Sequence, residues 1–474
     1  MKKIIGIVGG VVAVGLLSYP GFGVLAEKGL RHQLDAMPKQ YGMSLELTSF
    51  SHHWFTSDAK LHWAWQIPAH LTQNDQGQTV TISPQHFEKE FNIKIFHGPI
   101  VFHIGKPFIG IGYADSTLDW PIFSNLPDKN QFSKGSVFPK INLQMGLNFL
   151  FQTSWNTEVP PFNLTSLDQK TQLKWQGLSL TNKIGDKAKF FDGVINLVGL
   201  NLIKDKSQFT LTNVQSDYNF KKDQSNLYTG RGNLNIAVVD ILDFNQNKIK
   251  LADFAFHTSS KVNNNQFSAT VKMQLKKLLF NDKTMGPFEL DTRLRNLNPS
   301  VLYRMHQTLQ QEQNASPSFR QKNLWSLVSS LPELVKYGFE YDLKKLHMVL
   351  DNGRIDSSGS VVVPTDASGT TDSLKALQKL EVNWNIQISQ TLLSGWVADV
   401  VEKQMTQQML NDQNQPPAEE LHKTAVTRTD AKIASLLSSG VLESKASEYM
   451  ISIHYKNGQL TVNNKSFDPS WLVI

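Results

Sequence analysis

Hydrophobic and polar residues alternate along much of the chain, from about residue 45 to residue 294. The pattern is clearest in Phe267–Leu275, where five apolar residues alternate with four polar residues. The same two-residue period occurs in Leu61–Ile67, Phe91–Ile95 and Leu234–Val238. Because successive side chains of a strand point to opposite faces, this period predicts antiparallel strands with one buried and one solvated face.

A helical period replaces this alternation after residue 297. Asn298–Pro299 has the form of an N-cap followed by proline in the first turn, and the helix is expected to reach about Gln311. Apolar residues at three- and four-residue spacing predict a second helix over Leu324–Gly338. Two further amphipathic helices are expected over Leu392–Leu410 and Glu419–Ser439, after a short strand near Val382–Ile388.

Two Asn-Gly pairs predict tight hairpins in this later region. Asn352–Gly353 and Asn457–Gly458 each suit a two-residue type I′ turn, because both central residues of that turn need positive φ. The first turn would pair Leu350 with Ile355 across its hairpin. The second would close the chain with a terminal β-hairpin.

These patterns together predict a mainly β protein with helices, of the α+β class. We expect a membrane anchor or signal segment over residues 1–26, a β-rich region over 27–297, and an α+β region over 298–474 that holds both hairpins. The long antiparallel region would form either two packed sheets or one curved sheet that leaves an apolar groove.

The N-terminal segment predicts where the protein is located. Lys2 and Lys3 precede a run without charged residues from Ile4 to Ala26. As a helix, this run is long enough to cross ~30 Å of hydrocarbon, and the lysines favour a cytoplasmic N-terminus. We therefore expect a single-pass membrane protein with its bulk outside the cytoplasm. The alternative is a signal peptide that is cleaved near Ala26 and releases a secreted protein.

Composition excludes several kinds of site and partner. The 474 residues include no cysteine, which excludes disulfides, thiolate zinc sites and cysteine nucleophiles. The net charge of +6 is spread along the chain without a dense basic run, so no nucleic-acid partner is expected. No cofactor is expected either.

Two features suggest catalysis or metal binding but lack the surroundings that such chemistry needs. Seven of the thirteen histidines lie between His52 and His103, yet adjacent strand residues face opposite ways and no HExxH occurs, so no metal site is expected. Ser57 and Lys60 match the S-x-x-K pattern of acyl-transferring enzymes, but they enter a strand and no S-D-N or K-T-G element follows. A hydrolase is therefore the weaker alternative to a non-enzymatic protein.

Several short motifs follow the N-terminal segment: "EKGLRHQL", an aromatic signature ending in Ala59, "HGPI", and the closing "YKNGQLTVNNK". In these motifs the chain resembles the YdgA/YihF-like bacterial envelope proteins, a domain-of-unknown-function family. His52 and His53 stand where that family usually has Arg and Gly. The resemblance implies an inner-membrane-anchored periplasmic protein with no known reaction. Its structural signature comprises Trp54, Phe55, Ser57, His97, Gly98, Pro99, Asn457 and Gly458.

The functional expectation is a membrane-anchored envelope protein that is not an enzyme. An apolar groove on a curved sheet would bind lipid or another hydrophobic ligand. A closed sandwich would instead act as an interaction scaffold for an envelope protein partner.

Overall fold

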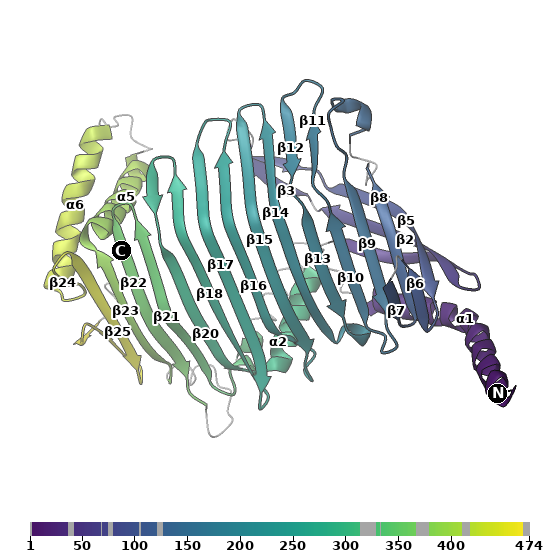
Figure 1. The fold of residues 1–474 in the computed structure, drawn as a ribbon. Coiled ribbons are helices and arrows are strands. Elements are labelled where there is room, and N and C mark those ends of the chain that lie inside the picture. The colour runs from purple at the N-terminus through teal and green to yellow at the C-terminus, as the bar shows by residue number, and fades with distance from the viewer. Residues whose placement is uncertain are drawn as a thin grey trace. The chain divides into compact units, whose positions relative to one another are not determined.

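The computed structural model confirms a mainly β protein, with 60% of the structure in strands and 20% in helices. The chain divides into two compact units, which are considered one at a time (Figure 1). Unit 1 comprises residues 1–222 and 239–246, and unit 2 comprises residues 223–238 and 247–474. The structure describes residues 2–36, 42–67, 69–73, 79–103, 106–120, 127–312, 329–331, 333–365, 379–409 and 418–467.

Unit 1 contains a long helix, α1 (Lys2–Ala36), and one main antiparallel sheet. The strands of this sheet pair in the order β1 (Met43–His52), β2 (Thr56–Ile67), β5 (Gln85–His97), β8 (Gly112–Asp119), β9 (Lys140–Leu147), β10 (Thr153–Val159), β13 (Leu178–Ile184), β14 (Phe190–Lys204) and β15 (Ser207–Lys222).

Shorter elements complete unit 1. Strand β12 (Thr171–Trp175) pairs with the second half of β14, and β11 (Phe162–Thr165) pairs with β12. Two separate hairpins and two 3-10 turns account for the rest: β3 (His70–Gln73) with β4 (Thr79–Ile82), β6 (Ile100–His103) with β7 (Lys106–Ile109), η1 (Lys129–Gln131) and η2 (Asp186–Ala188).

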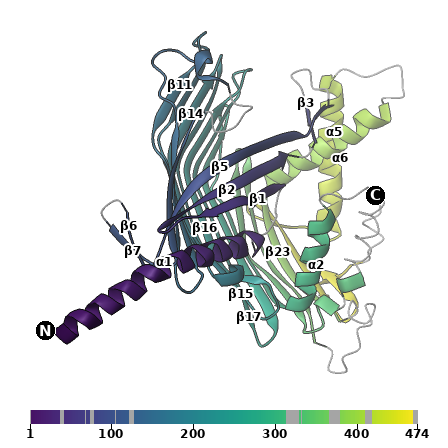
Figure 2. The same ribbon diagram turned by 90° about the vertical axis from the view of Figure 1, so that its right-hand side faces the viewer.

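Helix α1 packs on one face of this sheet, beside β1, β2 and β5 (Figure 2). Its residues Ala26, Leu30 and Leu34 are buried. They form a core with Ala59, Leu61, Ile93, Ile95, Ile111, Ala114, Met145 and Leu147. The helix continues through Pro20, and its later turns are held by apolar contacts with the sheet, which supply most helical stability in proteins.

The anchor expected from the sequence lies partly outside the described side chains. Side chains of α1 are described from Ser18 onward, so those of the run from Ile4 to Leu17 are not. In the described part of the chain, no helix has both the length and the apolar character that crossing a membrane requires.

Unit 2 consists of further antiparallel strands together with helices. Strand β16 (Tyr228–Leu242) contributes residues to both units. The other strands are β17 (Lys248–Asn263), β18 (Gln266–Phe280), β19 (Lys283–Met285), β20 (Phe288–Leu297), β21 (Phe339–Leu350), β22 (Gly353–Val363), β23 (Glu381–Ser389), β24 (Glu443–Lys445), β25 (Glu448–Lys456), β26 (Gln459–Val462) and β27 (Lys465–Ser466). The helices are α2 (Pro299–Glu312), α5 (Gln390–Met409) and α6 (Ala418–Ser438).

The helices predicted in this region are confirmed where they are described. The side chain of Asn298 accepts a hydrogen bond from the Ser300 backbone N–H at 3.1 Å, as the predicted N-cap of α2 should. Helices α5 and α6 match their predicted ranges within a few residues. Of the helix expected over Leu324–Gly338, residues 329–331 and 333–334 are helical, and residues 324–328 and 332 lie outside the described residues.

One hairpin prediction is confirmed and the other is wrong by its register. Asn457 and Gly458 have φ of 51° and 79°, as a type I′ turn requires. In the other hairpin Leu350 pairs with Gly353 rather than with Ile355, and the turn lies one residue earlier. A contact with a neighbouring strand supports this register: Ser389, at the end of β23, accepts a hydrogen bond from the Arg354 backbone N–H at 2.9 Å.

Candidate functional site

The signature residues from the first hundred positions gather where α1 meets the sheet of unit 1. Trp54 and Phe55 form the turn between β1 and β2, and both are about half exposed. The Tyr19 ring of α1 lies edge-on to Phe55, with 4.9 Å between the ring centroids. The Tyr19 hydroxyl donates a hydrogen bond to the carbonyl oxygen of Ile100 at 3.1 Å. These contacts fix the start of the docked part of α1.

Gly98 leaves the space that Tyr19 occupies. Its φ of 141° lies in a region that residues with side chains rarely adopt. A Cβ atom at this position would overlap the Tyr19 ring and lie 2.6 Å from Cδ1. The carbonyl of the following Pro99 accepts a hydrogen bond from the Gly110 N–H at 3.3 Å. The "HGPI" motif therefore shapes the surface on which α1 rests.

His97 is buried beneath the same helix. Its side chain is 1% exposed, and neither ring nitrogen has a hydrogen-bond partner in the described part of the chain. A Cβ at Gly23 would lie 3.0 Å from His97 Nε2, so the helix touches the ring closely. Burial lowers the pKa of His97 below its usual value, and the charge of nearby His52 acts in the same direction. His97 is therefore a neutral packing residue that supports α1.

A polar contact secures the helix at the edge of this junction. His52 Nε2 lies 2.9 Å from Glu27 Oε2, and Arg31 Nε donates to Glu27 Oε1 at 2.9 Å. At the other end of the docked segment, Gln33 Nε2 donates to the carbonyl oxygens of Phe151 and Gly185. Both ends of the docked segment are thus tied to the sheet.

The geometry at Ser57 does not assemble the S-x-x-K chemistry. Ser57 is fully buried, and its hydroxyl has no partner among the described residues. Lys60 is three residues further along β2, so it points to the opposite face, where it pairs with Glu90 at 2.5 Å. Within the described chain, no three His, Asp or Glu side chains are grouped to hold a metal ion.

A second feature of unit 1 is the unequal character of the two faces of its sheet. One row across β10, β13, β14 and β15 consists of Val159, Leu178, Leu197 and Val214. The adjacent row, which points the other way, consists of Glu158, Ser179, Asn196 and Gln215. The apolar row shares its face with Met145 and Leu147, against which α1 packs, so the helix covers one end of an apolar surface.

Away from α1 this apolar row is partly buried. From residue 189 to residue 222, which includes all of β14 and β15, no hydrophobic side chain is fully buried. Four strands about 4.8 Å apart and seven residues of about 3.3 Å each give this surface an extent of about 15 by 20 Å, or about 300 Å². Apolar surface patches of about this size are often functional.

Unpaired polar atoms lie on this face close to α1. They are Thr153 Oγ1, Trp155 Nε1 and Asn182 Oδ1, which are buried and lack hydrogen-bond partners among the described residues. Trp155 pairs with Asn182 across the two strands, and Thr153 is two residues from Trp155 on the same face. The surface is therefore polar at its α1 end and apolar toward Leu197. Such an arrangement fits an amphiphile, whose polar group can satisfy these atoms.

Unit 1 also has a groove of about 470 Å³ beside β11, β12 and β14. Phe162 and Trp175 stack in its wall with centroids 5.8 Å apart. Trp175 Nε1 donates to the carbonyl of Val159 at 3.3 Å. The aromatic pair is thus held by the sheet, and the rest of the lining mixes polar and apolar side chains without a defined chemistry.

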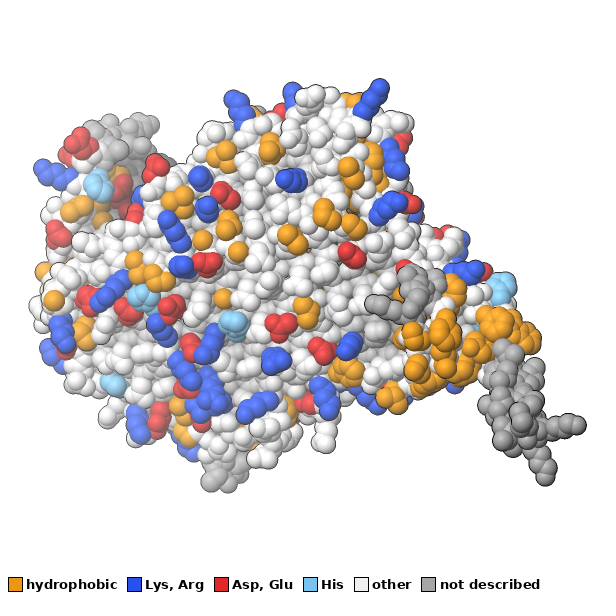
Figure 3. Space-filling model, viewed as in Figure 1, with side chains coloured by type: hydrophobic (Ala, Val, Ile, Leu, Met, Phe, Trp, Pro, Cys, Tyr) orange, Lys and Arg blue, Asp and Glu red, His pale blue; other side chains and the backbone are white. Residues whose placement is uncertain are grey.

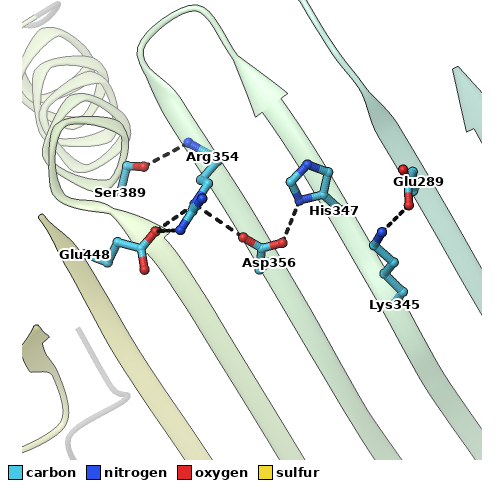
Figure 4. A network of polar contacts seen from close by, with 7 residues as sticks. All are labelled: Glu289, Lys345, His347, Arg354, Asp356, Ser389 and Glu448. Atoms are coloured by element: carbon cyan, nitrogen blue, oxygen red, sulfur yellow. Dashed lines mark hydrogen bonds and ion pairs between the residues drawn. The ribbon is translucent and has the colours of Figure 1, made fainter. Parts of the chain in front are cut away.

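Unit 2 carries a ladder of charged side chains on one sheet face (Figure 4). Arg354 Nε donates to Glu448 at 2.7 Å, and His347 Nδ1 lies 2.6 Å from Asp356. Lys345 and Glu289 form a further pair in the ladder. Among the described residues, no hydroxyl is hydrogen-bonded to His347, so the pair with Asp356 lacks the nucleophile of a catalytic triad. These are cross-strand ion pairs of the sheet.

The sequence predicted the signature residues but not the helix residues that they contact. Tyr19, Gly23 and Glu27 follow one another at four-residue intervals, which is a signal for one helix face that the uncharged run obscured. The other signature pair, Asn457 and Gly458, is in unit 2 and forms the terminal turn.

The fold and the junction define a helix-docked, open antiparallel β-sheet protein. The chain belongs to the bacterial proteins of unknown function designated DUF945, whose family model matches residues 1–470. Comparison with curated proteins and with solved structures gives no match.

Proposed function

We propose that this bacterial protein is held at the inner membrane by its N-terminal segment and binds a lipid or similar amphiphile on the apolar face of the unit 1 sheet. The apolar rows of β13, β14 and β15, whose side chains are only partly buried, carry the proposal. A soluble sheet normally buries such a face against a second layer, and here α1 covers only one end of it.

The energetics favour an acyl chain as the occupant. Each methylene group removed from water contributes about 0.8 kcal/mol, so ten methylenes contribute about 8 kcal/mol before the costs of binding. The unpaired atoms of Thr153, Trp155 and Asn182 would accept and donate hydrogen bonds to the polar group of the ligand.

Membrane attachment is supported by the packing of α1. Cleavage near Ala26 would remove Tyr19 and Phe22 from the junction and would cut the helix where Ala26 is in the core. The intact helix keeps these contacts, so we favour an uncleaved anchor with the bulk of the chain in the periplasm. On the N-terminal motifs we also infer kinship with the YdgA/YihF-like envelope proteins.

Two substitutions on adjacent residues of β14 test the ligand site. Leu197→Glu places a charge on the apolar face, whereas Val198→Glu places the same charge on the opposite face, where Val198 is 56% exposed. We expect Leu197→Glu to reduce uptake of a fluorescent fatty acid by the full chain at least tenfold, since an ionised carboxylate on that face opposes acyl-chain burial. Val198→Glu should bind like the unmodified protein.

Native mass spectrometry of gently extracted protein provides the complementary measurement. Native samples should carry added mass that delipidation removes. Equal masses in both samples, together with no fatty-acid uptake, would replace the ligand proposal with an envelope interaction scaffold.

A further inference from the structure

Exposed hydrophobic side chains surround the first described turn of α1. They are on three hairpins of unit 1: β1 with β2, β6 with β7, and β9 with β10. The residues are Trp54, Phe55, Phe102, Ile109, Phe149 and Leu150. Phe102 is 79% exposed and Ile109 is 66% exposed, so these side chains are not part of the core. Figure 3 shows hydrophobic side chains gathered in this area, close to the described beginning of α1.

Contacts with α1 show that the three hairpins lie next to the same part of the helix. Tyr19 packs on Phe55 and donates to the carbonyl of Ile100, and Phe22 lies 6.1 Å from Phe149 between ring centroids. Tyr19 and Phe22 are one helical turn apart. The three hairpins therefore line α1 at the level of Tyr19 and Phe22. We call their exposed hydrophobic side chains the collar.

The length of α1 indicates what covers this collar. The uncharged run begins at Ile4, and its residues from Ser18 onward belong to the described, docked part of unit 1. The remaining segment Ile4–Leu17 has a length of about 21 Å at 1.5 Å per residue. The hydrocarbon layer of a bilayer is about 30 Å thick, so this segment falls short by about 9 Å.

We propose that the collar enters the membrane surface and supplies the missing depth. Apolar groups at an interface penetrate by about 5–10 Å, which matches the shortfall. Tryptophan, tyrosine and phenylalanine suit this depth, where one side is lipid and the other is water. The inference rests on the membrane attachment in the proposed function and is independent of the ligand on the apolar face.

The absence of cysteine makes a direct depth measurement possible. Single-cysteine variants Phe102→Cys and Ile109→Cys would carry spin labels on the collar, and Leu167→Cys would carry one in the turn between β11 and β12. Leu167 is a matched control because it is a hydrophobic turn residue of unit 1 with 64% exposure. The full chain would be reconstituted in vesicles of phosphatidylethanolamine and phosphatidylglycerol.

We expect the collar labels to collide more often with oxygen, which concentrates in lipid, and less often with a water-soluble nickel complex. The Leu167→Cys label should show the opposite pattern. Aqueous behaviour at Phe102→Cys and Ile109→Cys in vesicle-bound protein would overturn the collar and leave the anchor intact. A chain that does not sediment with vesicles would overturn both. Lipid-exposed collar labels without fatty-acid uptake would support the collar and refute only the ligand site.

Discussion

Replacement of Gly98 by alanine should weaken the docking of α1. The φ of 141° costs a residue with a side chain about 1–3 kcal/mol. The new Cβ would also overlap the Tyr19 ring, and overpacking of this kind costs about 1–3 kcal/mol. The two effects together should lower the free energy of α1 docking by about 2–6 kcal/mol.

Hydrogen exchange measured by mass spectrometry reports this docking directly, because it resolves local opening. A loss of about 2 kcal/mol should speed exchange of the amides in residues 19–36 roughly 30-fold, at a tenfold change per 1.4 kcal/mol. Gly21→Ala is the control, since no atom lies within 4 Å of its Cβ position. Adding Tyr19→Ala to Gly98→Ala should restore only the part of the docking free energy that is lost through overlap of the new Cβ with the Tyr19 ring.

Exchange in Gly98→Ala that is no faster than in Gly21→Ala would refute the proposed packing of Tyr19 on Gly98. It would mean that the helix is held elsewhere, or that the backbone at residue 98 adapts without cost.

Three further outcomes follow from the structure. Because burial lowers the pKa of His97, the undocked state binds the proton first, so stability present above about pH 6.5 should be lost as the pH falls through the folded-state pKa. Thermal unfolding of His97→Gln should show a weaker loss of stability than the unmodified chain, and an equal loss would assign it to groups other than His97. Gly458→Val should destabilise the terminal hairpin by about 1–3 kcal/mol, because φ is 79° there, and an unchanged melting temperature would contradict the turn. Glu448→Gln should change stability by about 1 kcal/mol or less in a urea titration, because its partner Arg354 is half exposed; a larger loss would show that the ladder is a cooperative network.

The strands and their faces could be read from the sequence with good accuracy. Alternation in Phe267–Leu275 predicted a strand, and the structure places it within β18. Alternation specifies which side chains share a face, but it contains no information on which strand lies next to which. The choice between a sandwich and an open sheet therefore needed the pairings. The misplaced prediction of the turn at Asn352 has a related cause, because the observed register is supported by a hydrogen bond to Ser389, which is distant in the sequence.

The junction could be predicted only in part. The aromatic turn and "HGPI" were visible as motifs, but their common purpose depends on α1, which contacts both. A histidine on a strand is ordinarily expected to face water, and nothing local marks His97 as buried. Its burial follows from the close approach of Gly23, which is 74 residues away in the sequence.

The two-sided sheet of unit 1 also restricts which insertions the chain can tolerate. Leu197 and Val198 face opposite ways, so one extra residue inside β14 would move every later side chain of that strand to the wrong face. The rows that continue into β10, β13 and β15 would then pair apolar with polar positions. An added residue in the turn at Asp205–Lys206 would leave both strands in phase, because no row crosses it. Length variation in this region should therefore be confined to the turns, while the strands keep a fixed residue count.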